Sequence, residues 1–269
     1  MNKQIERTII SLAVLTGAYA CGEGLQKDET SINSSGAGGA AGLGGTNNTG
    51  GSNAGGLGGL SGTGGADCIE NNPGSGFEGA ATSYYGVTGN TAEEAGSDIF
   101  DPQTGKGFKD PKTGKIYAAQ ASCDVEYTFD YEGKTYFKIE NDRKVCCWDF
   151  WVTECDAPYE AAVTLPRWGG CDYCWDQFLE GLVKHEQGHV DLCKAYSEKL
   201  EELIQGATAS ECADDCETAK LAATNNLVDK VEELAMAAKS EFDQKQDDYD
   251  NQTNHGETQG AVLDPDCKE

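Results

Sequence analysis

One long periodic segment constrains the fold more than any other part of the chain. Between Trp175 and Ile204, apolar side chains recur at steps of three and four residues, which is the spacing of one face of an α-helix. We therefore expect a long amphipathic helix whose apolar stripe is buried. The stripe consists of Trp175, Phe178, Leu179, Leu182, Val183, Val190, Cys193, Tyr196, Leu200, Leu203 and Ile204.

Three ionisable residues fall inside this apolar stripe: His185, Glu186 and His189. The two histidines are spaced so that they lie one helical turn apart on the same face and can hold one zinc ion. Glu186 follows the first ligand and can take a proton from water at the metal's open position. Burying such a trio is costly unless a metal uses it. The H-E-x-x-H pattern thus predicts a zinc site; the alternative is two satisfied core histidines beside a chance glutamate.

The N-terminus has the pattern of an export signal over residues 1–20. Lys3 and Arg7 precede an apolar run from Thr8 to Thr16 that is too short to span a bilayer. Ala18-Tyr19-Ala20 then offers a small-residue cleavage site, followed at once by Cys21. A cysteine at this position resembles the lipidation site of bacterial lipoproteins. We expect an exported protein anchored to a membrane of the cell envelope through Cys21; the alternative is plain cleavage and a secreted, soluble protein.

Residues 21–76 are expected to form a flexible tether between the lipid anchor and the folded part. Fifteen of the 31 residues from 36 to 66 are glycine, mixed with small polar residues. Such a composition cannot bury enough apolar surface to fold. The folded domain should therefore span residues 77–269.

The folded domain is expected to be of the α+β class, with an N-terminal antiparallel β-rich part followed by two long helices. Glu132-Gly133-Lys134 has the composition of a hairpin turn. The helix that contains the H-E-x-x-H motif should end near Gly206. Ser210 is the expected N-cap of the second helix, and the short link predicts an antiparallel helix pair. The runs expected to form strands are 83–87, 123–131, 135–140 and 145–153.

The formal net charge of −26 excludes nucleic acid and an anionic membrane surface as electrostatic partners of the whole chain. Membrane contact is therefore expected through the lipid anchor only.

Twelve cysteines in an exported chain predict disulfides. Cys146 and Cys147 would face opposite sides of a strand and need different partners. Cys212 and Cys216 would share a helix face and connect the second helix to the β-rich part. Cys193 is expected not to pair with Cys212, which should lie too far along the helix pair. The alternative use of four cysteines is a structural zinc site formed by Cys171, Cys174, Cys212 and Cys216.

Several motifs resemble a bacterial family of unknown function that is described as predicted secreted zinc-dependent proteases. They are Y-Y-G-V-T-G-N-T at residues 84–91, L-P-R-W at 165–168, Trp175 ahead of H-E-Q-G-H, and Y-D-N-Q-T-N-H-G at 249–256. The resemblance implies a zinc peptidase with His185 and His189 as ligands, Glu186 as general base and His255 as third ligand. The chain departs from the family in its extra cysteines, a duplicated D-P-x-T-G-K loop and the glycine-rich tether.

Two other zinc frameworks bear on the third ligand. The metzincin pattern requires glycine and histidine where this chain has Leu192 and Ala195, so it is excluded. The gluzincin pattern uses a glutamate from a following helix and stays open as an alternative, with Glu232 and Glu233 as examples. If His255 is the ligand, Asp250 is expected to orient a ligand imidazole. Tyr249 is the expected hydrogen-bond donor to the oxyanion.

Together these patterns predict an exported, lipid-anchored zinc peptidase that acts on proteins or peptides. The rival functions are a non-catalytic metal-binding module of the envelope and a disulfide-rich surface adhesin with an accidental motif.

Overall fold

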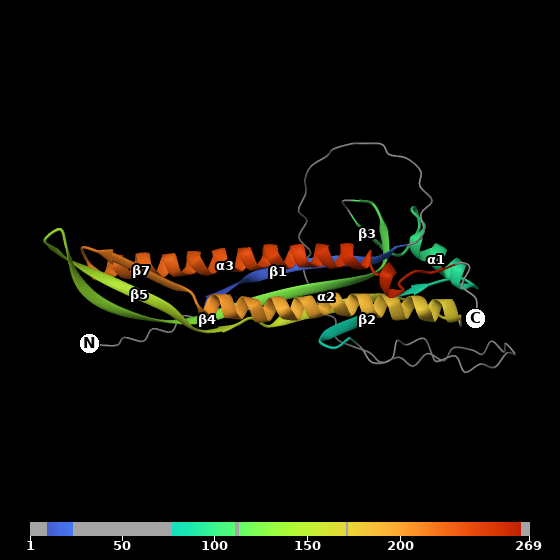
Figure 1. The fold of residues 1–269 in the computed structure, drawn as a ribbon, viewed down its shortest axis with the longest axis horizontal. Helices are drawn as coiled ribbons and strands as arrows, with labels where there is room; N and C mark the ends of the chain where they lie inside the picture. The colour runs from blue at the N-terminus through green and yellow to red at the C-terminus, as the bar shows by residue number, and fades with distance from the viewer. Residues whose placement is uncertain (1–9, 24–76, 111–112, 171, 265–269) are drawn as a thin grey trace, which may run out of the picture. The chain divides into compact units, whose positions relative to one another are not determined.

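The computed structural model describes residues 10–23, 77–110, 113–170 and 172–264. All described residues belong to one compact unit. The described part is a mixed α+β fold with an open sheet and three helices (Figure 1). Its elements are β1 (Ile10–Glu23), β2 (Ala80–Val87), α1 (Ala92–Phe100), β3 (Phe108–Lys109), β4 (Ile116–Glu140), β5 (Arg143–Asp156), β6 (Tyr159–Trp168), α2 (Tyr173–Gln205), β7 (Thr208–Ala213), α3 (Cys216–Thr253) and the short 3₁₀ helix η1 (Glu257–Gln259).

The seven described strands form one sheet organised around β4. The main order is β2-β6-β4-β5-β7, and β1 and β3 also pair with β4. Strand β4 pairs with β6 over residues 120–125 and with β5 over residues 128–140. The sequence predicted an antiparallel sheet, but β2 and β6 run parallel. A parallel neighbour needs a long crossover connection, and here the chain from α1 through β5 supplies it.

The hairpin turn predicted at Glu132-Gly133-Lys134 is wrong, because β4 continues through it. Gly133 lies opposite Phe150 of β5, and a side chain on Gly133 would overlap the Phe150 ring. The glycine therefore makes room for an aromatic ring in the middle of a strand. The chain turns instead at Asn141 and Asp142, both of which have positive φ (48° and 61°), as a tight two-residue hairpin requires.

Both long helices begin at aspartate caps. The Asp172 side chain accepts a hydrogen bond from the backbone N–H of Cys174, and α2 ends at Gly206 as predicted. The N-cap predicted at Ser210 is wrong, because residues 208–213 form β7 and add a strand to β5. Helix α3 starts later, with Asp215 accepting from the N–H of Thr218.

Helices α2 and α3 contact each other along the sheet and cover it over β4 and β5 (Figure 1). The core lies between these helices and the sheet. The apolar stripe predicted for α2 is buried there, including Trp175, Phe178, Leu182 and Leu200.

Three disulfides form between described residues: Cys123–Cys193 joins β4 to α2, Cys146–Cys216 joins β5 to the start of α3, and Cys147–Cys212 joins β5 to β7. The prediction that Cys146 and Cys147 need different partners is confirmed, and so is the prediction that Cys193 does not pair with Cys212. The shared helix face is wrong, because Cys212 lies on β7 and Cys216 begins α3. The alternative structural zinc site is excluded, because Cys212 and Cys216 are oxidised.

The predicted export signal and lipidation site fall partly on β1, whose backbone pairs antiparallel with β4. Residues 1–9 and the tether from residue 24 to 76 lie outside the described residues. Across the ranges that are described, no helix has both the length and the apolar character to cross a bilayer. Export, lipidation at Cys21 and the tether stay predictions.

Candidate metal centre

Helix α2 carries His185, Glu186 and His189 into the protein interior. The first two are 0 % exposed and His189 is 2 % exposed, which confirms that all three lie within the buried stripe. The two imidazoles meet edge to face with ring centroids 4.7 Å apart, and their Nε2 atoms are 3.1 Å apart. One turn of helix thus brings two nitrogens that could bind a metal to a common point.

A carboxylate from α3 joins this point. The Oδ1 atom of Asp250 lies 3.3 Å from Nε2 of His185 and 3.0 Å from Nε2 of His189. One ligand atom from each of the three residues lies within 4.8 Å of the others, so the group could hold a metal ion. Glu232 and Glu233 of α3 are not part of this group.

The orientation of the His189 ring follows from its hydrogen bonds to Gln246 of α3. The side-chain amide nitrogen of Gln246 donates to the backbone carbonyl of His189 at 3.4 Å, and a carbonyl can only accept. The amide oxygen of Gln246 must then face Nδ1 of His189, with which it forms a second hydrogen bond. Nδ1 therefore carries the proton, and in the neutral ring the lone pair is on Nε2, which faces Nε2 of His185 and Oδ1 of Asp250.

A second chain of hydrogen bonds fixes His185 in the same way. The hydroxyl of Tyr249 donates to the His185 carbonyl at 3.2 Å, so it must accept from the amide nitrogen of Gln259, also at 3.2 Å. The amide oxygen of Gln259 then accepts from Nδ1 of His185 at 2.9 Å. The hydroxyl of Thr253, which donates to the Tyr249 carbonyl, is a further acceptor for Nδ1 at 3.2 Å.

Three hydrogen-bond acceptors therefore converge in a buried site. Two neutral imidazole lone pairs and a carboxylate oxygen within about one hydrogen-bond length repel one another unless a cation, either a proton or a metal ion, lies between them. Proteins orient metal-binding histidines by a hydrogen bond from the other ring nitrogen, and here side-chain amide oxygens accept it from each Nδ1. The supporting residues are thus arranged for a cation at Nε2.

The two imidazoles differ in their proton affinity. Burial lowers the pKa of His185, and the Asp250 carboxylate only partly offsets this. Burial also opposes protonation of His189, but the Asp250 carboxylate, the charge of Glu186 and the Gln246 carbonyl more than compensate, so the pKa of His189 is raised. A metal ion at this point competes with a proton mainly at His189.

Glu186 lies beside the cluster with neither carboxylate oxygen hydrogen-bonded within the described part of the chain. Burial raises the pKa of Glu186 to about 8; the charge of Asp250 adds to this and that of His189 opposes it. A buried carboxylate without a hydrogen bond is costly and is a mark of functional sites. This pKa is close to neutral pH, which suits a group that both accepts and releases protons.

The structure places the other predicted site residues around this cluster. His255 follows α3 in a left-handed turn (φ 50°), with Nδ1 3.8 Å from Oδ1 of Asp250 and its ring 5.1 Å from that of Tyr117. It is next to the group of three without being part of it. Tyr249 stacks on the His185 imidazole at 5.1 Å between ring centroids, and its hydroxyl is bonded to the His185 backbone.

Glycines on α2 allow the C-terminal segment to approach this closely. A side chain on Gly188, inside the H-E-Q-G-H motif, would overlap the Tyr249 ring and hydroxyl. A side chain on Gly181 would overlap the backbone of Gly260. Gly256, with φ of 89°, lies against the His185 ring. These close contacts allow η1, and with it Gln259, to pack against α2.

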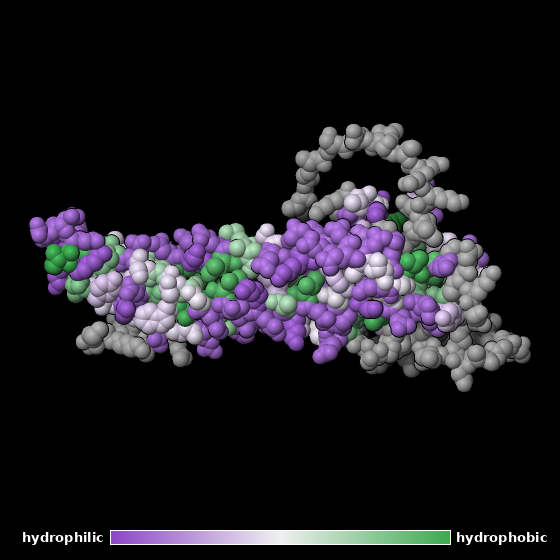
Figure 2. Space-filling view, viewed as in Figure 1, coloured by the Kyte–Doolittle hydropathy of each residue, from purple (hydrophilic) through white to green (hydrophobic). Residues whose placement is uncertain are grey.

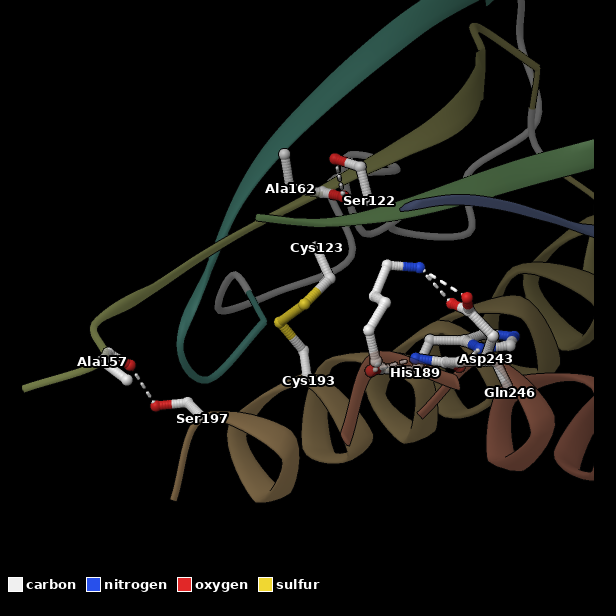
Figure 3. Close-up of a disulfide and its surroundings, with 10 residues drawn as sticks. Ser122, Cys123, Ala157, Ala162, His189, Cys193, Ser197, Asp243 and Gln246 are labelled. Carbon is white, nitrogen blue, oxygen red and sulfur yellow. Dashed lines mark hydrogen bonds and ion pairs between the residues drawn. A yellow bond between two sulfur atoms is a disulfide. The ribbon is translucent and has the colours of Figure 1, made fainter. Parts of the chain in front are cut away.

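One disulfide connects the sheet to α2 a single turn beyond the last histidine. Cys193 follows His189 by four residues and is bonded to Cys123 of β4 (Figure 3). One further turn along α2, the Ser197 hydroxyl donates to the Ala157 carbonyl at 2.6 Å. The stretch of helix after the cluster is thus fixed to the sheet by a covalent bond and a hydrogen bond.

The sequence reading missed Gln246, Thr253 and Gln259. A signal for the first two was present: the buried face of α3 is apolar up to Phe242, and then the same spacing places Gln246, Asp250 and Thr253 on it. Polar residues that continue a buried stripe indicate a buried polar network. Gln259 had no such signal, because it lies beyond the helix.

The model of one protein family, described as "Bacterial protein of unknown function (DUF922)", matches residues 82–256. The matched range includes the H-E-Q-G-H motif and the Y-D-N-Q-T-N-H-G motif. No curated protein and no solved structure matches the chain.

Proposed function

The chain belongs to the DUF922 family, and we propose that it is a zinc-dependent peptidase whose metal site is built on His185, His189 and Asp250. The observation that carries this proposal is the convergence of two imidazole lone pairs and a carboxylate oxygen next to a buried glutamate without a hydrogen bond. We take α2 and α3 to be an antiparallel pair that carries a zincin-like H-E-x-x-H site.

The donor set suits zinc. Two nitrogens and one oxygen are typical of catalytic zinc sites, which keep one further position open. Ligands about 2.0–2.1 Å from a tetrahedral zinc lie roughly 3.3 Å from each other, and the three separations here are 3.0, 3.1 and 3.3 Å. When bound, zinc would polarise a carbonyl group and make water at its open position more acidic.

Glu186 would move the proton during hydrolysis. Because its carboxylate has no other hydrogen bond within the described residues, it is free to accept a proton from water and return it to the leaving amine. A divalent cation nearby would lower its raised pKa and so favour the ionised form that acts as base.

His255 and Tyr249 keep their predicted roles as proposals. The His255 imidazole is close enough to Asp250 to join the metal, and in that arrangement Asp250 would instead orient a ligand imidazole. The Tyr249 hydroxyl is bonded to the His185 carbonyl, so to donate to an oxyanion it would have to give up that bond.

Substrate and location follow the sequence expectations. We propose protein or peptide substrates, export, and attachment to an envelope membrane through Cys21. Metabolic labelling with a fatty acid should mark the wild-type protein, and Cys21→Ser should release it from membranes. A soluble, unlabelled wild-type protein would contradict the anchor and leave the peptidase proposal intact.

The peptidase proposal is tested by metal analysis together with digestion of a peptide library. The purified protein should contain one zinc ion per chain and cleave peptides. Glu186→Gln should keep the zinc and lose at least about 10²-fold in rate, whereas Glu198→Gln, on the exposed face of the same helix, should behave as wild type. Zinc without cleavage by the wild-type protein would favour the non-catalytic metal-binding module. A protein that binds no metal would favour the adhesin.

A further inference from the structure

The end of the β4–β5 hairpin exposes apolar side chains that no part of the metal centre uses. Phe137 is 56 % exposed and Ile139 is 69 % exposed. They are two residues apart on one strand and so point to the same face. Figure 2 shows an apolar patch at this end of the hairpin, bordered by hydrophilic side chains.

Two disulfides hold this tip in one orientation. In the register of the hairpin, Cys146 lies opposite Phe137 and Cys147 lies opposite Tyr136. These cysteines connect β5 to the start of α3 and to β7. An isolated hairpin is only marginally stable in water, so the two crosslinks make the exposed tip a rigid projection. Rigid presentation of apolar side chains lowers the entropy cost of docking them.

The charge of the tip differs from that of the whole chain. Residues 134–144 contain four cations (Lys134, Lys138, Arg143, Lys144) and two anions (Glu140, Asp142), a net charge of 4 − 2 = +2. Ion pairs to Asp149 and Asp214 bring the tip to neutrality, against −26 for the chain. Charges farther away than the Debye length of about 8 Å are largely screened. The charge of −26 on the whole chain therefore does not exclude a membrane surface as partner of this tip.

The cations are placed beside the apolar side chains. Nζ of Lys144 lies 4.0 Å from the centre of the Phe137 ring, and Lys144 is opposite Ile139 in the hairpin. Lys138 is paired with Glu140 at 2.9 Å and Arg143 with Asp214 at 3.5 Å. These ion pairs are exposed and therefore weak, so replacing the carboxylate partner of each cation by a lipid phosphate costs little free energy.

We propose that the β4–β5 tip docks on a lipid bilayer, with Phe137 and Ile139 entering the boundary between headgroups and acyl chains. Lys138, Arg143 and Lys144 then lie at the level of the lipid phosphates. One acyl chain alone holds a protein to a membrane only marginally, and a second contact makes the attachment stable. The tip supplies this second contact to a chain predicted to carry a lipid at Cys21. The proposal does not depend on peptidase activity.

The test is flotation with vesicles of equal parts phosphatidylcholine and phosphatidylglycerol, at a lipid concentration where binding is not saturated. All proteins are full-length, exported so that the disulfides form, and carry Cys21→Ser to exclude acylation. The tip variant is Phe137→Ser with Ile139→Ser. The matched control is Leu221→Ser with Met236→Ser, which removes two apolar side chains of similar exposure (65 % and 63 %) from α3.

For the tip variant, the ratio of vesicle-bound to free protein should fall at least about tenfold. For the control, this ratio should equal that of the protein with an intact tip. Unchanged metal content and disulfide map would show that the tip variant is folded. Equal loss in both variants, no loss in the tip variant, or no binding by the intact tip would overturn the proposal. The last result would indicate that the apolar tip meets a protein instead.

Discussion

At the candidate metal centre, two histidines and a glutamate are almost completely shielded from water, whereas at the β4–β5 tip two apolar side chains are more than half exposed. Each region inverts the usual distribution of polar and apolar groups, and each is fixed by a different means. Amide hydrogen bonds and glycine contacts hold the metal centre. Two disulfides hold the hairpin.

The difference shows what each means of support can do. A disulfide limits how far two backbone segments move apart, but it does not set the rotation of an imidazole ring. A hydrogen bond to Nδ1 does set that rotation, and it decides which nitrogen is free. We infer that the hairpin needs a fixed position, whereas the metal centre needs fixed side-chain orientations.

The largest effect should come from removing a proposed ligand of the candidate metal centre. Asp250→Ala should weaken zinc binding by at least about 10³-fold if Asp250 is a ligand, whereas loss of a residue that only orients a ligand costs about 10- to 100-fold. His255→Ala should then fall in the smaller range. Isothermal titration with zinc measures both, and Glu232→Ala and Glu233→Ala serve as controls.

A larger loss of zinc affinity in His255→Ala than in Asp250→Ala would confirm His255 as the third ligand and assign Asp250 the orienting role. Loss of zinc only in Glu232→Ala or Glu233→Ala would indicate a gluzincin-type site and contradict both assignments. The tip variant Phe137→Ser with Ile139→Ser should bind zinc as wild type does, because no tip residue belongs to the cluster.

The second effect concerns the stability of the metal-free protein. The folded-state pKa of Glu186, about 8, lies above its ordinary value of 4.5, so the folded state binds this proton more tightly than the unfolded chain does. The free energy of unfolding should therefore fall as the pH rises from about 5 to 8, by up to about 4 kcal/mol from this group.

Denaturant titrations of wild type and Glu186→Gln, both without metal, measure this contribution. The variant should be the more stable protein at pH 8, and the difference should vanish near pH 4.5. If the stability of the two proteins depends on pH in the same way, the Glu186 carboxylate is not buried without a hydrogen bond. Saturating zinc should reduce the difference, because a nearby cation favours the ionised glutamate.

The third effect compares the disulfides of the two regions. Cys123–Cys193 and Cys146–Cys216 both span a sequence separation of 70 residues, but Cys147–Cys212 already closes nearly the same loop as Cys146–Cys216. In the chain-entropy model, losing Cys123–Cys193 should cost about 4 kcal/mol and losing Cys146–Cys216 should cost less. The double Ala variant of Cys123 and Cys193 should thus lose more stability than that of Cys146 and Cys216. Only the Cys123 and Cys193 variant should also bind zinc more weakly, by about threefold to tenfold, because Cys193 is one turn from His189.

Chemical denaturation and zinc titration of the two variants provide the comparison. Equal zinc affinity in both would show that the position of α2 is set by packing alone. Weaker zinc binding after loss of the hairpin disulfide would show that the two regions are coupled.

The smallest expected effect is a difference in stability between substitutions of two glycines, one within α2 and one at its end. Gly188→Ala should destabilise the protein by about 1–3 kcal/mol, because the added carbon must displace Tyr249. Gly206→Ala, at the end of α2, would make only an ordinary contact with the Leu203 carbonyl oxygen at 3.7 Å, and φ is −84°, so this substitution should be nearly neutral. Thermal denaturation measures both; equal melting temperatures would contradict the close packing of Tyr249 on α2.

The sequence predicted helix α2 well, because the periodicity of burial is a local pattern within one element. Both the buried stripe and the end of α2 at Gly206 are confirmed. The turns were harder to predict, because glycine has two uses that composition does not separate. Gly133 makes room for Phe150 within a strand, whereas Asn141 and Asp142, which form the turn, are common residues in many contexts.

The supporting residues of the metal centre depend on contacts between distant segments. Gln259 reaches His185 across 74 positions of sequence, and a local pattern carries no information on such a contact. The disulfide partners illustrate an intermediate case. Alternation along a strand predicted that Cys146 and Cys147 have different partners, but only the position of β7 decides which partner each takes.

The position of η1 has a practical consequence for anyone who trims this protein to a minimal domain. The family match ends at residue 256, at the glycine that lies against His185. A chain cut there would keep every residue of both motifs and still lose Gln259, the amide that holds Nδ1 of His185. Domain boundaries drawn from family membership should therefore be extended through Ala261, which is fully buried. A truncated protein that fails to bind metal would otherwise be mistaken for evidence against the site.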